Sequence, residues 1–145
     1  MFDELSKGVL CRGPEETAAL AARLASSVRE GTVALVGDLG AGKTTFAKGL
    51  ARGLGVSAPV KSPSYSICMT YSGALSNFVH VDAYRLKSPE DYDSLLIDEI
   101  VPDPKLVCVE WPQIVAQALP HDALWIEILP SGEDSGSRLI RLLKS

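Results

Sequence analysis

The apolar residues of this 145-residue chain fall into short runs, and the spacing within each run predicts its structure. Val33 to Val36 and Leu106 to Val109 are continuous apolar runs of strand length, which favour strands buried on both faces. Phe46, Leu50 and Leu54 recur every four residues, as the residues on one face of a helix do. Strands that alternate with helices in this way predict a mostly parallel sheet with helices on its faces.

Weaker patterns extend this prediction to the rest of the chain. Residues 13–16 read GPEE, with Gly, Pro and acidic residues where a helix begins, and Leu20, Leu24 and Val28 give that helix an apolar face. Residues 88–91 read SPED and predict a second helix start. We also expect strands at 9–11, 66–71, 77–81, 124–129 and 138–143, a short helix at 114–119, and polar turns at 72–73 and 131–137.

These elements predict one domain over residues 1–145 with a three-layer α/β fold: a mostly parallel sheet, helices on both faces and an antiparallel edge. The strands at 66–71 and 77–81 would form a hairpin added to the parallel sheet. The strand at 138–143 would lie at an edge. In the helix after SPED, Tyr92, Leu95 and Leu96 would share one face.

The turn between the first buried strand and the helix after it carries a phosphate-binding pattern. Residues 37–45 read GDLGAGKTT, which fits G-x-x-x-x-G-K-[ST] at Gly37, Gly42, Lys43 and Thr44. Glycine lets consecutive backbone N–H groups point inward and leaves no side chain in the way. The helix that begins at Lys43 adds the positive end of its dipole. The pattern predicts a nucleoside triphosphate site; the alternative is a glycine-rich turn that binds no ligand.

Each residue of this turn has an expected role. Lys43 should reach the β- and γ-phosphates, the Thr44 hydroxyl should ligate Mg²⁺, and Thr45 should contact a phosphate nearer the sugar. Asp38 should point outward, because a triphosphate would repel its carboxylate. The residues expected to bind ATP are Gly37, Asp38, Leu39, Gly40, Ala41, Gly42, Lys43, Thr44 and Thr45.

Two acidic residues end apolar runs and compete for the role of supporting Mg²⁺. They are Asp82, after the run from Phe78 to Val81, and Glu110, after the run from Leu106. An acid in this position can hold the metal or orient a water molecule. For Asp82 the alternatives are a turn cap and an ion pair with Arg85.

Three neighbouring features also keep more than one interpretation. His80 is better explained as a strand histidine with satisfied hydrogen bonds than as a ligand or base. Trp111 is either a core residue or an aromatic side chain close to the nucleotide. Residues 60–65 read VKSPSY and should form a loop around Pro63, either a nucleotide-sensing switch or a polar connector.

Composition limits the function further. A formal net charge of −4 and a pI near 5.1 argue against a dominant nucleic-acid surface, so we expect contact with RNA to run through a partner. No apolar run approaches about 18 residues, and the start MFDELSK does not resemble a secretory signal. Cys11, Cys68 and Cys108 are widely separated and resemble reduced thiols. We therefore expect a cytoplasmic protein that makes no contact with membranes and has no structural zinc.

Four motifs stand in one order along the chain: GDLGAGKTT at 37–45, KSPSY at 61–65, HVDAYRL at 80–86 followed by SPED, and VEWP at 109–112. Together they closely resemble the TsaE (YjeE) family of bacterial tRNA threonylcarbamoyladenosine biosynthesis ATPases. The resemblance runs from about Pro14 to Trp111 and weakens toward the C-terminus. A phosphate loop alone would indicate only a superfamily, whereas this ordered set is far more specific.

The resemblance implies a P-loop NTPase-like fold and an ATP-hydrolysing, Mg²⁺-dependent accessory protein. Members of the family are needed to attach a threonylcarbamoyl group to the adenosine beside the anticodon of certain tRNAs. The transfer itself belongs to the TsaD–TsaB complex, which they join, so homologues of TsaD and TsaB are the implied partners and tRNA is met indirectly.

The resemblance also implies roles for single residues. It places Thr44 and Glu110 on Mg²⁺, gives Asp82 a part in hydrolysis and puts Trp111 beside the nucleotide. The implied catalytic residues are Lys43, Asp82 and Glu110. Residues 61–65 resemble the switch-like loop of the family.

Several positions depart from the family pattern. Ser64 stands where Thr is usual, Met69 near a usual Glu and Leu96 near a usual Gly. None of these is expected to contact phosphate, so the departures bear on partner contacts and loop shape rather than on ATP binding. Arg138 is the candidate match to a C-terminal arginine of the family that would contact the nucleotide.

Two other functions fit the same loop. A small-molecule or nucleoside kinase would transfer phosphate to a hydroxyl, but such enzymes usually need a lid and an acceptor pocket, for which this chain leaves little room. A non-catalytic nucleotide-dependent switch would only signal occupancy to a partner.

Overall fold

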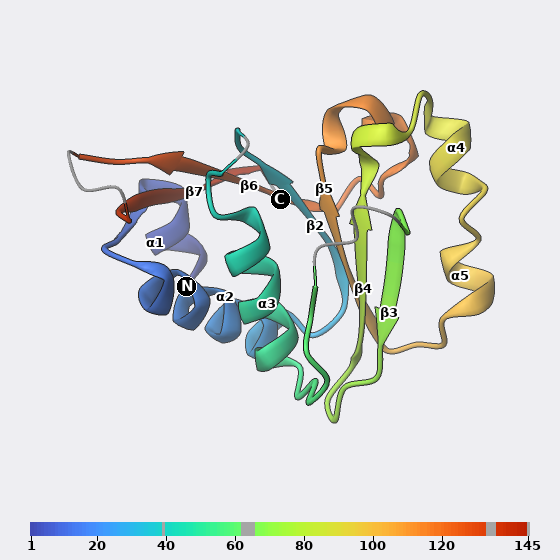
Figure 1. Ribbon diagram of the computed structural model, residues 1–145, viewed down its shortest axis with the longest axis horizontal. Coiled ribbons are helices and arrows are strands. Elements are labelled where there is room, and N and C mark those ends of the chain that lie inside the picture. The colour runs from blue at the N-terminus through green and yellow to red at the C-terminus, as the bar shows by residue number, and fades with distance from the viewer. Residues whose placement is uncertain (39, 62–65, 133–135, 145) are drawn as a thin grey trace.

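A computed structural model describes residues 1–38, 40–61, 66–132 and 136–144 of the chain. The described residues form a seven-stranded sheet in the order β1-β7-β6-β2-β5-β4-β3 (Figure 1). Its strands are β1 (Val9–Cys11), β2 (Gly31–Val36), β3 (Cys68–Tyr71), β4 (Asn77–Asp82), β5 (Lys105–Glu110), β6 (Leu124–Pro130) and β7 (Arg138–Lys144).

The centre of the sheet is parallel and both of its flanks are antiparallel. Strands β6, β2, β5 and β4 run in one direction, whereas β3 pairs with β4, and β7 with β6 and β1, in the opposite direction. The predicted α/β fold, its hairpin and its antiparallel edge are confirmed. The prediction that 138–143 is an edge strand is wrong, because Val9 to Cys11 pairs with β7 and makes β1 the edge.

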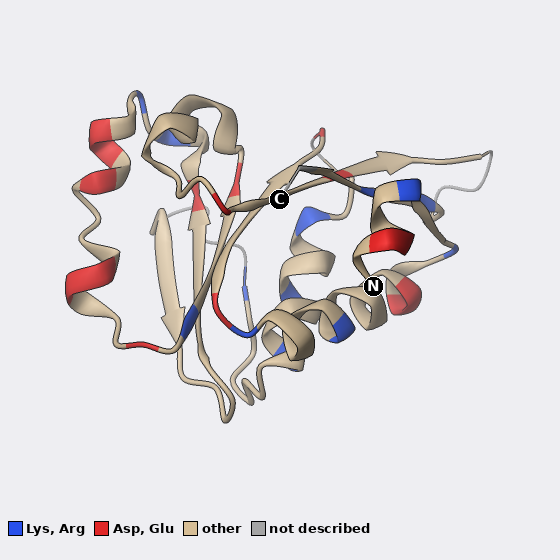
Figure 2. Cartoon of the chain, turned by 180° about the vertical axis from the view of Figure 1, so that it is seen from behind, with Lys and Arg blue, Asp and Glu red and all other residues tan. Residues whose placement is uncertain are grey.

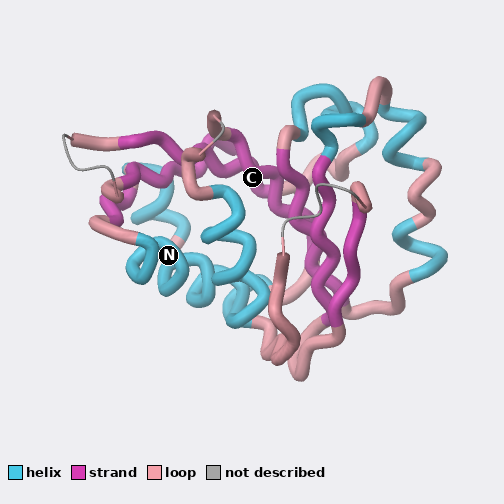
Figure 3. Tube along the Cα trace, viewed as in Figure 1, coloured by secondary structure: helices cyan, strands magenta, loops and turns pink. Residues whose placement is uncertain are grey.

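Two groups of helices cover the sheet, and they lie to either side of the strands (Figure 3). The first group is α1 (Phe2–Lys7), α2 (Pro14–Val28) and α3 (Lys43–Gly53). The second group is η1 (Ala83–Arg85), α4 (Pro89–Asp93), α5 (Ile97–Ile100) and η2 (Pro112–Ala118). Each group packs on its own hydrophobic cluster, so the three predicted layers are confirmed.

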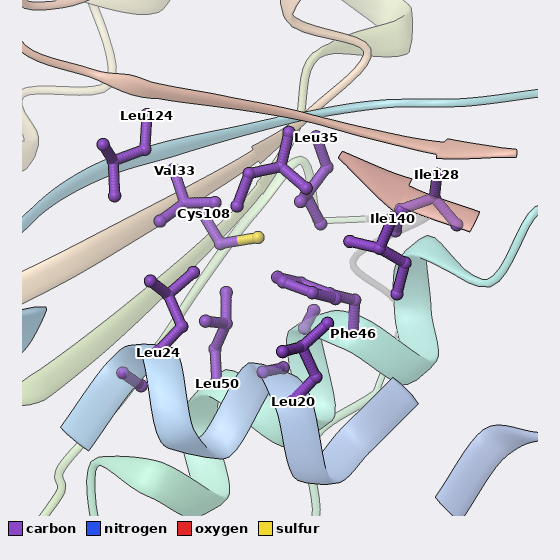
Figure 4. Packing of buried hydrophobic residues seen from close by; sticks show 14 of the residues in the cluster. Leu20, Leu24, Val33, Leu35, Phe46, Leu50, Cys108, Leu124, Ile128 and Ile140 are labelled. Carbon is purple, nitrogen blue, oxygen red and sulfur yellow. The ribbon is translucent and has the colours of Figure 1, made fainter. Parts of the chain in front are cut away.

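The larger hydrophobic cluster fills the space between α2, α3 and the sheet. Leu20 and Leu24 from α2 and Phe46 and Leu50 from α3 point toward strand residues that include Val33, Leu35, Cys108 and Ile128 (Figure 4). The four-residue spacing in the sequence therefore buries one face of each helix, as predicted. This packing fixes the N-terminus of α3 at the end of β2.

The short elements differ most from the prediction. Tyr92 and Leu95 pack against the second hydrophobic cluster, but Leu96 has a left-handed φ of 55° and is half exposed. Leu96 therefore does not share their face, because α4 ends at Asp93 and a new helix begins at Ile97. The helix predicted at 114–119 is a 3-10 helix that begins at Pro112. The sequence patterns did not predict a helix where α1 lies. Residues 62–65 of the VKSPSY loop and 133–135 of the turn at 131–137 lie outside the described residues.

The charged residues, the cysteines and the helix lengths that the sequence raised can be located in the fold. Figure 2 shows Asp and Glu residues along α4 and α5, well separated from the Lys and Arg residues of α3. Cys11, Cys68 and Cys108 are all free thiols, and Cys11 and Cys108 are buried. Over the described ranges, no helix combines the length and the apolar character that crossing a membrane requires.

Candidate functional site

The site is built where three parallel strands end at one edge of the sheet. In β4 and β5, Phe78, Leu106 and Cys108 belong to the cluster beneath α2 and α3. Because alternate strand residues share a face, His80, Asp82 and Glu110 lie on that same face. Asp82 and Glu110 are direct neighbours in the register of β4 and β5. The two acids predicted from separate apolar runs are thus side by side.

The glycine-rich turn enters this edge from β2 and leads into α3. Gly42 caps the helix with a left-handed φ of 104°, a conformation that glycine reaches without steric cost. A Cβ on Gly37 would lie 2.8 Å from the backbone oxygen of Ile128, so a side chain there would push the turn away from β6. Leu39 lies outside the described residues. The glycines of the pattern are therefore required by the backbone, whether or not a ligand is bound.

Lys43 is the first residue of α3, and its side chain is buried. Its Nζ donates to the Gly37 backbone oxygen at 2.6 Å and lies 3.6 Å from the centre of the Trp111 ring. Burial lowers the pKa of the Lys43 ammonium below its usual value. The carboxylates of Glu110, Asp82 and Asp38 oppose that pKa shift, in this order of size. A cation is therefore held between the turn, an aromatic ring and the strand-end acids.

Glu110 and His80 form a buried pair beside Lys43. The Glu110 Oε2 atom lies 2.5 Å from His80 Nε2, and His80 is fully buried. The His80 Nδ1 atom has no hydrogen-bond partner among the described residues. His80 is thus satisfied at one nitrogen only, and it contacts a predicted site residue, which the sequence interpretation did not anticipate.

Asp82 also caps the turn that follows β4. Its Oδ1 accepts a hydrogen bond of 3.0 Å from the backbone N–H of Tyr84, so the predicted alternative of a turn cap is present. Tyr84 in turn meets the Trp111 ring edge to face, with 5.4 Å between the ring centres. Trp111 has a left-handed φ of 54° and joins β5 to η2. The Trp111 ring lies against the Lys43 ammonium and is only partly buried, so Trp111 is not a residue of the hydrophobic core.

The remaining predicted residues lie around the turn. Asp38 and Gly40 are exposed, Ala41 is buried, and Thr44 and Thr45 are half-buried in the first turn of α3. Thr45 also lines a cavity of about 190 Å³ with Gly42 and Arg138. The described residues of the prediction therefore lie around the turn and the strand-end acids, and the structure adds His80 and Tyr84. Arg138, the candidate nucleotide contact, lies against the turn and donates to the Ala41 and Gly40 backbone oxygens.

A signal for the role of His80 was present in the sequence. His80 lies two residues before Asp82 in a strand, so the period of a strand puts both on one face. Arg138 is the polar residue that begins the last strand, but only the folded sheet brings it to the turn. Tyr84 lies within the HVDAYRL motif, but neither its residue type nor its spacing assigned it a role at the site.

The carboxylates near Lys43 offer oxygen atoms, the donor type that Mg²⁺ prefers. In the stretches that the structure describes, no group of three or more His, Cys, Asp and Glu side chains is arranged to hold a metal ion. Mg²⁺ usually takes one or two carboxylates together with substrate phosphates and water. The Thr44 hydroxyl and the carboxylates of Glu110 and Asp82 therefore fit such an ion when it comes with a nucleotide.

A glycine-rich turn between a central parallel strand and the helix after it, in a sheet covered on both faces, is the arrangement of a P-loop NTPase-like fold. Comparison with known proteins narrows this class. The family model described as "Threonylcarbamoyl adenosine biosynthesis protein TsaE" matches residues 11–140. The chain belongs to the TsaE family.

Individual relatives agree with this assignment. The tRNA threonylcarbamoyladenosine biosynthesis protein TsaE of Bacillus subtilis is 39% identical over 122 residues, which cover 83% of this chain and 76% of that protein. The protein of the same name from Treponema pallidum is 36% identical, with 81% and 87% covered. The crystal structure of B. subtilis YdiB superposes with a TM-score of 0.69 at 32% identity and covers 93% of this chain and 82% of that one.

Proposed function

We propose that this protein is a Mg²⁺-dependent ATPase that serves as an accessory subunit in the threonylcarbamoyladenosine modification of tRNA. One observation carries the ATPase proposal: the buried Lys43 ammonium lies between the glycine-rich turn and the strand-end carboxylates. The names of its relatives support the pathway, since both proteins described above are tRNA threonylcarbamoyladenosine biosynthesis proteins.

Phosphate binding would fall to the turn and the start of α3. The N–H groups of the first helical turn have no partner within the helix, and the dipole favours an anion there. Lys43 would leave the Gly37 oxygen and bind the β- and γ-phosphates, while Thr45 would contact a phosphate nearer the sugar. Residues 37–45 would line the nucleotide, with Trp111 beside it.

The carboxylates would divide the remaining work. Thr44 and Glu110 would hold Mg²⁺, which, when bound, neutralises negative charge on the phosphates. Asp82 would orient or deprotonate the attacking water. Its Oδ1 accepts from Tyr84, and the second oxygen is left to accept from water. Lys43, Asp82 and Glu110 are thus the proposed catalytic residues.

The proposed partners are homologues of TsaD and TsaB, with tRNA contacted through their complex. The protein would not transfer the threonylcarbamoyl group but would reset the complex between turnovers. The role places it in the cytoplasm, where tRNA is modified. The net charge of −4 suits contact with a protein partner better than direct RNA binding.

Reconstitution of tRNA modification tests this proposal. Purified TsaD and TsaB homologues, tRNA and threonylcarbamoyl-adenylate are mixed with wild-type protein, with Asp82→Ala or without either. Wild-type protein should support many turnovers per complex, and Asp82→Ala should allow about one. Equal modification without the added protein would refute the accessory role.

A further inference from the structure

Arg138 connects the last strand of the sheet to the glycine-rich turn. Its Nε donates to the Ala41 backbone oxygen at 2.7 Å, and its Nη2 donates to the Gly40 oxygen at 3.2 Å. Its Nη1 donates to the Ser137 oxygen at 2.9 Å, which holds the guanidinium against its own strand. All three guanidinium nitrogens therefore bind backbone carbonyls, and two of these carbonyls belong to the turn.

These contacts determine which way the turn presents its N–H groups. In a trans peptide the C=O and the N–H point in opposite directions. With the Ala41 oxygen held by Arg138, the N–H of Gly42 in the same peptide must point away from Arg138. The left-handed φ of Gly42, 104°, then turns the chain into α3. Arg138 thus binds the outer, carbonyl side of the turn and leaves the N–H side for an anion.

The other end of the turn is held in a similar way. Lys43 Nζ donates to the Gly37 oxygen, so one cation closes the start of the turn and another supports its end. The guanidinium suits the second position because its planar fork can serve two adjacent carbonyls at once. A lysine there would keep the charge but could not reproduce that geometry.

We propose that Arg138 is a positioning residue that holds the turn in its anion-binding shape from the carbonyl side, without contacting the nucleotide itself. This inference rests on the proposed nucleotide binding at residues 37–45. It makes the strand β7 part of the site, although 97 residues separate Arg138 from Ala41 along the chain.

Amide hydrogen exchange without nucleotide tests the shape directly. Arg138→Met removes the donors but keeps a long side chain, and Arg138→Lys keeps the charge. Arg141→Met is the matched control, because Arg141 lies on the same strand and pairs with Glu127. Exchange at Ala41, whose N–H donates to the Asp38 oxygen at 2.9 Å, should rise about tenfold in Arg138→Met, less in Arg138→Lys, and not at all in Arg141→Met.

Nucleotide affinity separates positioning from direct contact. The dissociation constant for Mg·ATP should rise about 10- to 100-fold in Arg138→Met, with kcat at saturating ATP nearly unchanged. Weaker binding with unchanged exchange would show a direct contact and overturn the inference. If Arg138→Lys matches the wild-type protein in both exchange and affinity, the positive charge alone is sufficient. That result would also overturn the inference.

The inference and the proposed function can fail separately. If wild-type protein does not bind Mg·ATP, the proposed function falls, and exchange still decides whether Arg138 shapes the turn. If Arg138→Met does not fold, Arg138→Lys decides, because it too loses the fork and wild-type exchange in it contradicts the inference.

Discussion

Glu110 and His80 are hydrogen-bonded to each other and buried: Oε2 and Nε2 are 2.5 Å apart, and the two residues are 5% and 0% exposed. With the Glu110 carboxylate as acceptor, His80 Nε2 is the donor. The bond fixes one oxygen of Glu110 and leaves Oε1 for another partner. His80 therefore orients the carboxylate that we propose to hold Mg²⁺.

Replacing His80 with Leu should leave Glu110 buried without its donor. We expect the free energy of unfolding to fall by about 2 kcal/mol, because a hydrogen bond to a buried charge is lost. The Mg²⁺ concentration for half-maximal nucleotide binding should rise about tenfold. Urea unfolding and Mg²⁺ titration measure these effects. His80→Gln, which can place an N–H near Nε2, should recover much of both; an equal loss in both variants would contradict the orienting role.

Trp111 should report nucleotide binding by its fluorescence. The Lys43 ammonium lies over its ring, and a nucleotide that draws Lys43 toward the phosphates would change the environment of the indole. ATP titration should therefore change the emission until the site is saturated. Trp111→Phe should abolish the change, whereas Trp125→Phe, which removes the other tryptophan, should retain it. The reverse result would mean that Lys43 does not leave Trp111.

Gly37→Ala should damage the turn without a change in charge. Its new methyl group would meet the Ile128 oxygen at 2.8 Å, and that backbone atom cannot move without disturbing β6. We expect a loss of about 1–3 kcal/mol in unfolding free energy, together with weaker nucleotide binding. Gly13→Ala is the control, since nothing lies within 4 Å of a Cβ at Gly13. Equal stability of the two variants in urea would show that the turn accommodates the added methyl group without cost.

Stability should decrease in alkaline solution because of Cys108. Burial raises the pKa of this thiol well above its usual value of 9.0, and the charge of Glu110 raises it further. The folded chain therefore keeps a proton that the unfolded chain loses once the pH passes 9.0, so the free energy of unfolding falls as pH rises. The slope should be up to about 1.4 kcal/mol per pH unit from this group. In urea unfolding at pH 8 to 10, Cys108→Ala should reduce the fall of the unfolding free energy with pH. An unchanged slope would show that other groups cause this fall.

The central part of the fold could be predicted because its signals are local. The strand from Val33 to Val36, the turn after it and the helix with Phe46 and Leu50 each carry their pattern within a few residues. The two acids were found in the same way, as the ends of apolar runs. Parallel strands then bring such ends to one edge of the sheet.

What the sequence did not reveal depends on contacts between distant segments. The place of β7 inside the sheet follows from its pairing with β1, and no local pattern records that pairing. The contact of Arg138 with the turn follows from the same arrangement. Leu96 has a left-handed φ of 55°, unusual for a leucine, so its position outside the helix could not be predicted from apolar spacing.

ATP hydrolysis by Lys43→Ala and Lys48→Ala, assayed in parallel, tests the central claim most directly. Both lysines lie on α3, but Lys43 is buried at the turn and Lys48 is exposed. The site described above predicts that Lys43→Ala lowers kcat/KM at least about 100-fold, while Lys48→Ala retains wild-type activity. Wild-type hydrolysis by a folded Lys43→Ala protein would contradict it.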